Sequence, residues 1–187
     1  MNTLQDLIKQ YASQYIEQVV EWRRHIHSHP ELSGEEKDTS LFIQKVLTKL
    51  GIPFVNDVSD YAVIGKIEGA HTGPVIALRA DIDALPIHEE TDLPFASQNE
   101  GVMHACGHDS HIAILLGAGA ILQSIKDQLH GTVKLVFQPS EEEALFPGAQ
   151  GIVDSGILYD VDEIYGLHVW PQLPVGTVGL KKGNLMA

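Results

Sequence analysis

The order of the apolar segments along the chain is the feature that most restricts its fold. Apolar residues recur at three- and four-residue steps over residues 3–28 and again from about residue 33 to residue 50, which predicts two amphipathic helices. Two β segments at 61–67 and 74–79 come next, and the short turn between them predicts a hairpin-like pair. Two helices therefore precede the first strand of the predicted sheet.

The rest of the chain alternates between helical and β patterns. Residues 80–103 lack periodicity and are rich in Asp, Glu and Pro, so they predict a long loop with a functional role. Beyond this loop, the patterns predict a helix at 109–126, a strand at 132–137, a short helix near 149–155, a strand at 163–169 and the beginning of a strand at 177–182. This alternation is typical of the α/β class, here with a mixed β-sheet sandwiched by helices.

The composition restricts the compartment and the partners. Asp and Glu number 25 against 12 Lys and Arg, so the formal net charge is −13 and a basic nucleic-acid-binding surface is excluded. Cys106 is the only cysteine, which rules out an intramolecular disulfide and favours a reducing compartment. The N-terminus lacks a secretory signal, and the longest apolar stretch, at 112–122, is too short for a membrane helix. We therefore expect a soluble, cytoplasmic protein that has neither nucleic acid nor a membrane as a partner.

Polar residues collect at the points where predicted strands end. Asp81 and Asp83 follow the second β segment, three glutamates at 141–143 follow the next strand, and His168 lies near the end of the strand after that. The carboxyl ends of strands in an open α/β sheet line the binding crevice, so side chains distant in sequence can meet there. The sequence therefore predicts a ligand site at this edge of the sheet.

The densest group of reactive side chains is at residues 104–111, which hold three histidines and the only cysteine. Imidazole and thiolate are good ligands for Zn²⁺ and other first-row cations, so this segment favours a metal site. Two other interpretations stay open for the segment by itself. Cys106 can be a small buried apolar residue beside histidines that pack or cap the next helix, or it can be a nucleophile with a neighbouring histidine as its base.

The glutamates at 141–143 bear on that choice. A cluster of carboxylates would raise the pKa of a thiol, which argues against Cys106 as a nucleophile. By themselves the glutamates can be no more than the acidic first turn of a helix. Beside a metal, two adjacent carboxylates can divide hydrolysis between them, because one coordinates the cation and the other removes a proton from the attacking water. His25, His27 and His29 would scatter around a helix, so we assign them no ligand role.

Five motifs occur along the chain: Arg24-His-Ile-His-Ser-His-Pro-Glu-Leu-Ser33, Ala77-Leu-Arg-Ala-Asp-Ile-Asp-Ala-Leu-Pro86, His104-Ala-Cys-Gly-His-Asp109, Val136-Phe-Gln-Pro-Ser-Glu-Glu142 and Gly166-Leu-His-Val-Trp-Pro171. With these motifs in the same order, the sequence resembles the aminoacylase, hippurate hydrolase and indole-acetyl-amino-acid hydrolase branch of the co-catalytic, dinuclear zinc-type metallopeptidases. The resemblance covers nearly the whole chain. It implies a metallopeptidase catalytic domain that hydrolyses the amide bond between an acyl group and an amino acid.

Carried over position by position, the resemblance implies roles for individual residues. The metal ligands would be Cys106, His108, Glu142 and His168. Cys106 would bridge two divalent cations, either Zn²⁺ or Mn²⁺ with Co²⁺ as an alternative. Glu141 would be the general base, and Asp81 would orient one of the ligands from behind it. The substrate would be a small N-acyl amino acid, and the complete enzyme would be a homo-oligomer.

The resemblance also sets expectations for the domain organisation. Residues 1–182 would be the N-terminal part of the catalytic domain, and residues 183–187 would begin a lid and dimerisation domain. The rest of that domain and one more metal-binding histidine would follow Ala187, so we expect no efficient hydrolysis from the 187-residue chain alone. After the paired glutamates the chain departs from the glycine-rich loop of many relatives, and no substrate contact is carried over there. The alternative functions are a dipeptidase or carboxypeptidase with the same metal chemistry and a non-catalytic metal-binding or interaction module.

Overall fold

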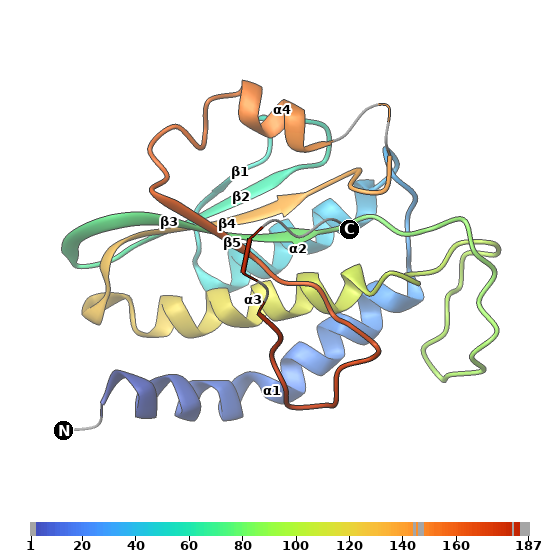
Figure 1. Cartoon of the computed structure of the whole chain (residues 1–187), viewed down its shortest axis with the longest axis horizontal. Helices are drawn as coiled ribbons and strands as arrows, with labels where there is room; N and C mark the ends of the chain where they lie inside the picture. Colours follow the sequence, from blue (N-terminus) through green and yellow to red (C-terminus); the bar gives the residue numbers. More distant parts are fainter. Residues whose placement is uncertain (1–2, 144, 146–147, 181, 184–187) are drawn as a thin grey trace.

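The computed structural model of the protein describes residues 3–143, 145, 148–180 and 182–183. Its elements along the chain are α1 (Leu4–Ser28), α2 (Lys37–Leu50), β1 (Phe54–Val55), β2 (Val63–Glu68), β3 (His71–Asp81), α3 (His108–Ser124), the 3₁₀ turn η1 (Lys126–Gln128), β4 (His130–Gln138), α4 (Gly148–Asp154) and β5 (Glu163–Gly166). Within the described residues, five strands form a sheet in the order β1-β2-β4-β3-β5 (Figure 1). β3 is parallel to β4 and β5, whereas β2 is antiparallel to β1 and β4. The sheet is therefore mixed, and the α/β class is confirmed.

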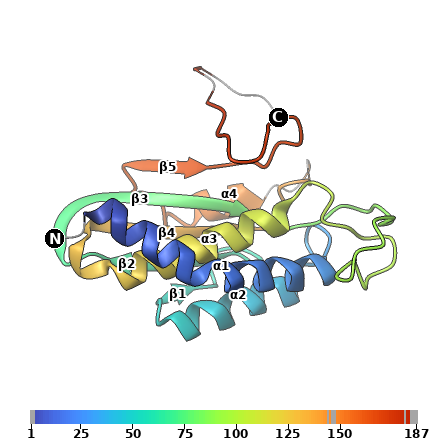
Figure 2. The ribbon, with the colours of Figure 1, turned by 90° about the horizontal axis from the view of Figure 1, so that it is seen from below.

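Helices cover both faces of this sheet, as the sequence predicted (Figures 1 and 2). Successive residues of a strand point to opposite faces, so Leu135 and Phe137 of β4 pack against α2 and α3, while Val136 packs against α4. The larger core includes Ile43, Val46, Leu47, Val63, Ile67, Ile112, Leu116, Leu135 and Phe137. The smaller core on the α4 side is formed by Ala62, Ile64, Ala77, Val136 and Ile152.

α3 is enclosed between the sheet and α1, which forms a third layer (Figure 2). A Cβ atom at Gly119 would lie 2.7 Å from Leu135 of the sheet, and one at Gly117 would lie 2.7 Å from Val19 of α1. The two glycines therefore allow α3 to approach both neighbours closely. This packing fixes the N-terminal turn of α3, where the reactive histidines lie. No helix in the described part of the chain combines the length and the apolar character needed to cross a membrane.

The helix boundaries follow local signals in the sequence. Thr3 and Asp6 form a capping box at the start of α1, because each side chain accepts a hydrogen bond from the main chain of the other residue. α2 ends at Gly51, whose φ of 67° lies in the left-handed region that glycine tolerates. The long loop before α3 is also confirmed, since the residues between β3 and α3 form only isolated β-bridges, but residues 80 and 81 of the predicted loop at 80–103 belong to β3.

The expected hairpin between β2 and β3 is wrong. β4 lies between the two strands, paired with both of them. The N–H of Gly69 donates to the oxygen of Gly131, and the N–H of His71 donates to that of Leu129, so the turn bonds to the chain that enters β4. A β pattern in the sequence predicts a strand but does not predict which other strand pairs with it.

The end of the chain also differs from expectation. β5 stops at Gly166, three residues before the end of the predicted strand. No strand forms over residues 177–180 or at Lys182, because no neighbouring strand is available there and Val178 and Leu180 are almost fully exposed. Of the expected start of a second domain at 183–187, residues 184–187 lie outside the described residues. The short strand β1 has no counterpart in the sequence prediction.

Candidate metal centre

The candidate site lies where three parallel strands end. β3, β4 and β5 run in the same direction, so the segments that follow them meet at one edge of the sheet, where α3 also begins (Figure 1). Candidate ligand atoms converge there in three groups, each with its atoms within 4.8 Å of one another: Cys106, His108 and His168; Asp81, His108 and His111; and His108, Glu141 and Glu142. All six site residues predicted from the sequence are brought together. His111 joins them.

The imidazole of His108 is at the centre of the site. Its Nδ1 atom donates to the main-chain oxygen of Asp83, at 3.0 Å, and lies 3.1 Å from the Asp83 carboxylate. A carbonyl oxygen only accepts, so Nε2 carries the free lone pair of the neutral ring. Nε2 is buried without a hydrogen-bond partner among the described residues, and it lies 3.8 to 3.9 Å from carboxylate oxygens of Asp81, Glu141 and Glu142. An unpaired imidazole nitrogen that faces three carboxylates fits a cation between them.

Asp83 fixes the site from behind His108. Its second carboxylate oxygen accepts from the Ser33 hydroxyl at 2.7 Å and from the Glu142 main-chain N–H at 2.9 Å. Burial by itself would raise the pKa of Asp83, but the bonds from His108, Glu142 and Ser33 lower that pKa below its usual value. In the sequence, Asp83 lies at the same strand end as Asp81, but no motif assigns it a role.

Asp81, predicted to orient a ligand, lies on the other side of the His108 ring. One of its oxygens pairs with Arg79, whose Nε donates to the Gln138 side chain at 3.0 Å. The other oxygen lies 3.5 Å from Nδ1 of His111 and 3.8 Å from Nε2 of His108. Asp81 therefore has a fixed position between two imidazoles.

Cys106 and His168 complete the site beside the glutamates. The Cys106 sulfur lies 3.2 Å from Nε2 of His168, whose Nδ1 donates to the oxygen of Val169. Burial, and then the negative charges of Glu142 and Glu141, raise the pKa of the Cys106 thiol to about 12. The thiol is therefore protonated at neutral pH, which argues against a cysteine nucleophile, as the sequence predicted. A cation at this position would displace the thiol proton, because thiolate is the form that binds metal.

The two glutamates lie on a loop held by α2. Ser140, with a φ of 51°, donates its main-chain N–H to the fully buried carboxylate of Glu36 at 2.6 Å. This contact fixes the chain one residue before Glu141. Burial, together with the charges of Asp81 and Glu142, raises the pKa of Glu141 above its usual value. A raised carboxyl pKa suits a group that must accept and return a proton near neutral pH. No pattern in the sequence indicated a role for Glu36.

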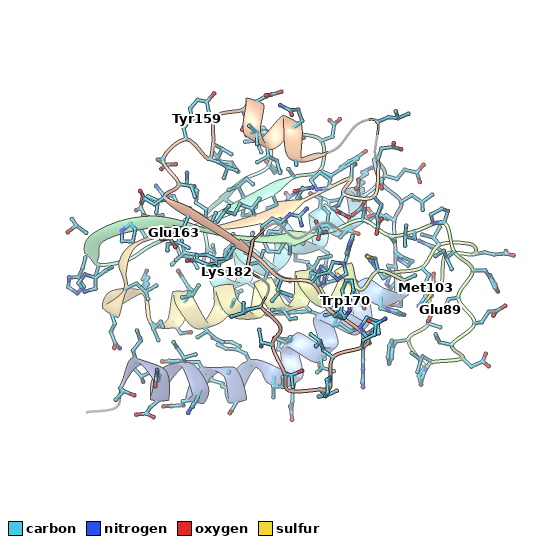
Figure 3. All side chains as sticks on the ribbon, in the orientation of Figure 1. Glu89, Met103, Tyr159, Glu163, Trp170 and Lys182 are labelled. Atoms are coloured by element: carbon cyan, nitrogen blue, oxygen red, sulfur yellow. The ribbon has the colours of Figure 1, made fainter. Side chains whose placement is uncertain are left out.

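Two further buried histidines lie close to the site but outside the three ligand groups. His27 of α1 bonds through Nδ1 to Asp109, at 2.8 Å, and through Nε2 to Glu89, at 3.1 Å. Glu89 belongs to the long loop before α3 (Figure 3), so His27 ties this loop to the start of α3. His104 is buried with neither ring nitrogen paired within the described residues, and burial lowers its pKa to about 4.

A mixed sheet whose carboxyl edge gathers imidazole, thiol and carboxylate groups defines an α/β domain with a candidate metal centre. Residues 77–183, more than half of the chain, match the family described as Peptidase family M20/M25/M40. The chain belongs to this family. The metallopeptidase family indicated by the five sequence motifs is thereby confirmed.

Named relatives agree with the family assignment. An N-acetyl-L-cysteine deacetylase of Bacillus subtilis (strain 168) is 50% identical over 170 residues, which cover 91% of this chain and 40% of the relative. An N-acyl-L-amino acid amidohydrolase of Geobacillus stearothermophilus is 42% identical, over 96% of this chain and 48% of the relative. The solved structure of the Bacillus subtilis YXEP protein, described as a dinuclear metal binding peptidase from the M20 family, superposes with a TM-score of 0.85 at 44% identity, covering 94% of this chain and 48% of that one. The chain therefore spans less than half the length of these relatives.

Proposed function

We propose that the protein is a metal-dependent amidohydrolase that cleaves the amide bond of N-acyl amino acids. The observation that carries this proposal is the convergence of two carboxylates, a thiol and a second imidazole around the unpaired Nε2 of His108. The substrate class is supported by the names of two relatives, one a deacetylase of an N-acetyl amino acid and the other an N-acyl-amino acid amidohydrolase.

The proposed metal ligands are Cys106, His108, Glu142 and His168. The Cys106 sulfur lies 3.2 Å from Nε2 of His168 and next to the Glu142 carboxylate, which supports the proposal that Cys106 would be shared by two cations. A thiolate with imidazoles favours Zn²⁺, and the carboxylates also suit Mn²⁺. Bound divalent cations would polarise the substrate carbonyl and make the attacking water more acidic.

Glu141 is the proposed general base. Its side chain is about one-third exposed, so it can reach both the site and a bound substrate. In the reaction it would remove a proton from the attacking water and deliver that proton to the amide nitrogen as the C–N bond breaks. Asp81 and Asp83 hold the imidazoles in place around it. Cys106 must stay reduced to bind metal, which supports the cytoplasm as the compartment.

We extend the proposal to the domain organisation. Residues 1–182 would belong to the catalytic domain, residues 183–187 would begin a second domain, and the complete enzyme would be a homo-oligomer. The lengths of the relatives support the presence of further chain, because this chain covers only 40 to 48% of them.

The experiment uses the complete product of the reading frame that encodes this chain. The purified protein is stripped with a chelator, reconstituted with Zn²⁺, Mn²⁺ or Co²⁺, and assayed on N-acetyl and N-benzoyl amino acids beside free dipeptides. We expect turnover of N-acyl amino acids that disappears with the metal and returns with it. A preference for dipeptides would favour the dipeptidase alternative. Metal binding without turnover of any substrate in the panel would favour the non-catalytic module.

A further inference from the structure

We propose that His111 is a positioning residue that fixes His168 in the metal centre through the main chain of Val169. The inference rests on the proposed function, in which His168 is a metal ligand. Val169 directly follows His168, and its main-chain N–H donates to Nε2 of His111 at 3.0 Å. His111 therefore bonds to the peptide unit that joins His168 to Val169.

His111 is a rigid anchor for this bond. It is 2% exposed and lies in the first turn of α3, which is enclosed between the sheet and α1. Its ring centre is 4.6 Å from that of His168 and 5.3 Å from that of His108. A displacement of the Val169 amide would therefore move the His168 ring relative to His108.

The hydrogen bond from the Val169 amide also decides whether His111 binds the metal itself or only supports the metal centre. Because Nε2 accepts a hydrogen bond, the neutral ring must carry its proton on Nδ1. Nδ1 lies 3.5 Å from the Asp81 carboxylate, and a nearby negative charge favours a proton on Nδ1. A cation bound to Nδ1 would require the proton on Nε2, where it would oppose the N–H of Val169. His111 thus supports the metal centre without binding the metal, although its atoms lie within reach of Asp81 and His108.

The segment that carries His168 needs such support. All four residues of β5 are exposed, and β5 pairs with β3 at the edge of the sheet. Over the described residues after β5, the other main-chain hydrogen bonds are local, from Leu173 to Trp170 and from Thr177 to Pro174. The chain beyond β5 extends away from the sheet (Figure 2). Few contacts other than those of Val169 therefore tie it to the core.

Val169 has a second contact, with Gly107, which lies between Cys106 and His108 at the start of α3. A Cβ atom at Gly107 would lie 2.4 Å from a methyl carbon of Val169, so only glycine permits this approach. Val169 is thus held by Gly107 and by His111 together. The result is the 3.2 Å separation between the Cys106 sulfur and Nε2 of His168, which brings both groups within reach of one cation. Figure 3 labels Trp170, the residue that follows, over this end of α3.

Three variants separate the hydrogen bond from the bulk of the side chain. His111→Gln keeps an acceptor near the position of Nε2, whereas His111→Leu keeps the size and removes the acceptor. His104→Leu is the matched control, because His104 is equally buried and, within the described residues, neither of its ring nitrogens is paired. Thermal unfolding of each variant shows whether it is folded at the assay temperature.

The first measurement uses the metal-free protein with ¹⁵N-labelled histidine. We expect NMR to find the Nδ1–H tautomer of His111 and slow hydrogen exchange at the Val169 amide. Exchange should become fast in His111→Leu and stay slow in His111→Gln and His104→Leu. An Nε2–H tautomer, or slow exchange that persists in His111→Leu, would overturn the proposal.

The second measurement is the affinity for Zn²⁺, by competition with a chromophoric chelator. Loss of a group that orients a ligand typically weakens metal binding about 10- to 100-fold, and we expect this for His111→Leu. His168→Ala should weaken binding at least as much, and the double variant should be no weaker than His168→Ala, because the two changes remove the same ligand. Additive losses, or unchanged affinity in His111→Leu, would overturn the positioning role alone. A wild-type protein that binds no Zn²⁺ would overturn the metal centre itself.

Discussion

His108 donates from Nδ1 to Asp83, at 3.0 Å from its main-chain oxygen, and this single contact determines which nitrogen of His108 faces the metal centre. The carboxylate of Asp83 also accepts from Ser33 and from the Glu142 amide. Asp83, just after the end of β3, thereby connects two proposed ligands, the imidazole of His108 and the carboxylate of Glu142, which are 34 positions apart in the chain.

Asp83→Asn tests this connection. The substitution keeps the size of the side chain but replaces one acceptor oxygen with an NH₂ group, which opposes the donors that Asp83 now accepts. We expect the affinity for Zn²⁺ to fall about 10- to 100-fold, as for other residues that orient metal ligands. Chelator competition measures it, with the exposed Asp57→Asn as the control. Equal affinities in the two variants would show that His108 and Glu142 are oriented without Asp83.

The run of three glutamates allows base and ligand to be separated. In the complete enzyme, Glu141→Gln should leave the metal content near normal and lower kcat at least about 100-fold, because general-base assistance contributes roughly 10²- to 10⁴-fold. Glu142→Gln should instead reduce the metal content. Glu143→Gln is the matched control, since the Glu143 carboxylate accepts from the nearby Leu145 amide and belongs to none of the three ligand groups. The reverse pattern in the first two variants would show that Glu142 is the general base and Glu141 the metal ligand.

Gly107→Ala should lower the free energy of unfolding by more than the cost of a left-handed backbone conformation alone. At Gly107 an alanine meets both a φ of 89° and the Val169 side chain at 2.4 Å, whereas at Gly34 it meets a φ of 80° and open space. The backbone term costs about 1 to 2 kcal/mol at either position. We therefore expect a loss of this size in Gly34→Ala and a larger loss in Gly107→Ala, measured by urea unfolding. Losses of the same size in both variants would mean that Val169 moves aside freely.

His27 gives the stability of the metal-free protein a defined pH dependence. The hydrogen bond to Asp109 raises the pKa of His27 above its usual value; burial opposes the shift, the bond to Glu89 adds to it, and the charge of Arg23 opposes it. A raised pKa in the folded state means that His27 contributes stability which is complete below its unfolded-state pKa of about 6.5 and is lost as the pH rises through the folded-state pKa.

Urea unfolding from pH 5 to pH 9, in the presence of a chelator, measures this contribution. The free energy of unfolding of the wild type minus that of His27→Gln should decrease with rising pH above about 6.5. The difference between the two proteins removes the contributions of the titrating groups that do not interact with His27. A difference that is constant with pH would show that His27 keeps the same charge in the folded and unfolded states.

The sequence predicted the place of the site better than its internal contacts. Parallel strands bring their carboxyl ends together, so the strand ends at Asp81, Glu141 and His168 were sufficient to predict the convergence. The contact between Glu36 and Ser140 joins residues 104 positions apart, and no pattern in the sequence predicts that the two residues meet. The hairpin was wrong for a similar reason, because β4 enters between two strands that are adjacent in sequence.

The role of Asp83 illustrates the same limit. Asp81 and Asp83 are separated by a single residue, and the sequence places both at the same strand end. Which carboxylate meets which imidazole depends on where α3 begins relative to the end of β3, and Gly107 with its φ of 89° sets that point. The pairing of carboxylates with imidazoles is therefore determined by the packing of α3 against the sheet and cannot be predicted from the spacing of the residues along the chain.

The exposed edge of β5 predicts self-association of the 187-residue chain. Within the described residues, β5 pairs only with β3, so its outer main-chain groups are free, and its side chains Ile164 and Tyr165 are 55% and 54% exposed. An apolar strand with an unpaired edge is a template for pairing with another strand, and a lysine there opposes it. Sedimentation at increasing concentration should therefore show dimers or larger species for the wild type and mainly monomer for Ile164→Lys. Leu41→Lys, which changes an equally exposed apolar residue on α2, is the control and should associate like the wild type. A wild-type chain that stays monomeric at every concentration, or an Ile164→Lys variant that associates as strongly as Leu41→Lys, would show that the edge of β5 does not drive the association.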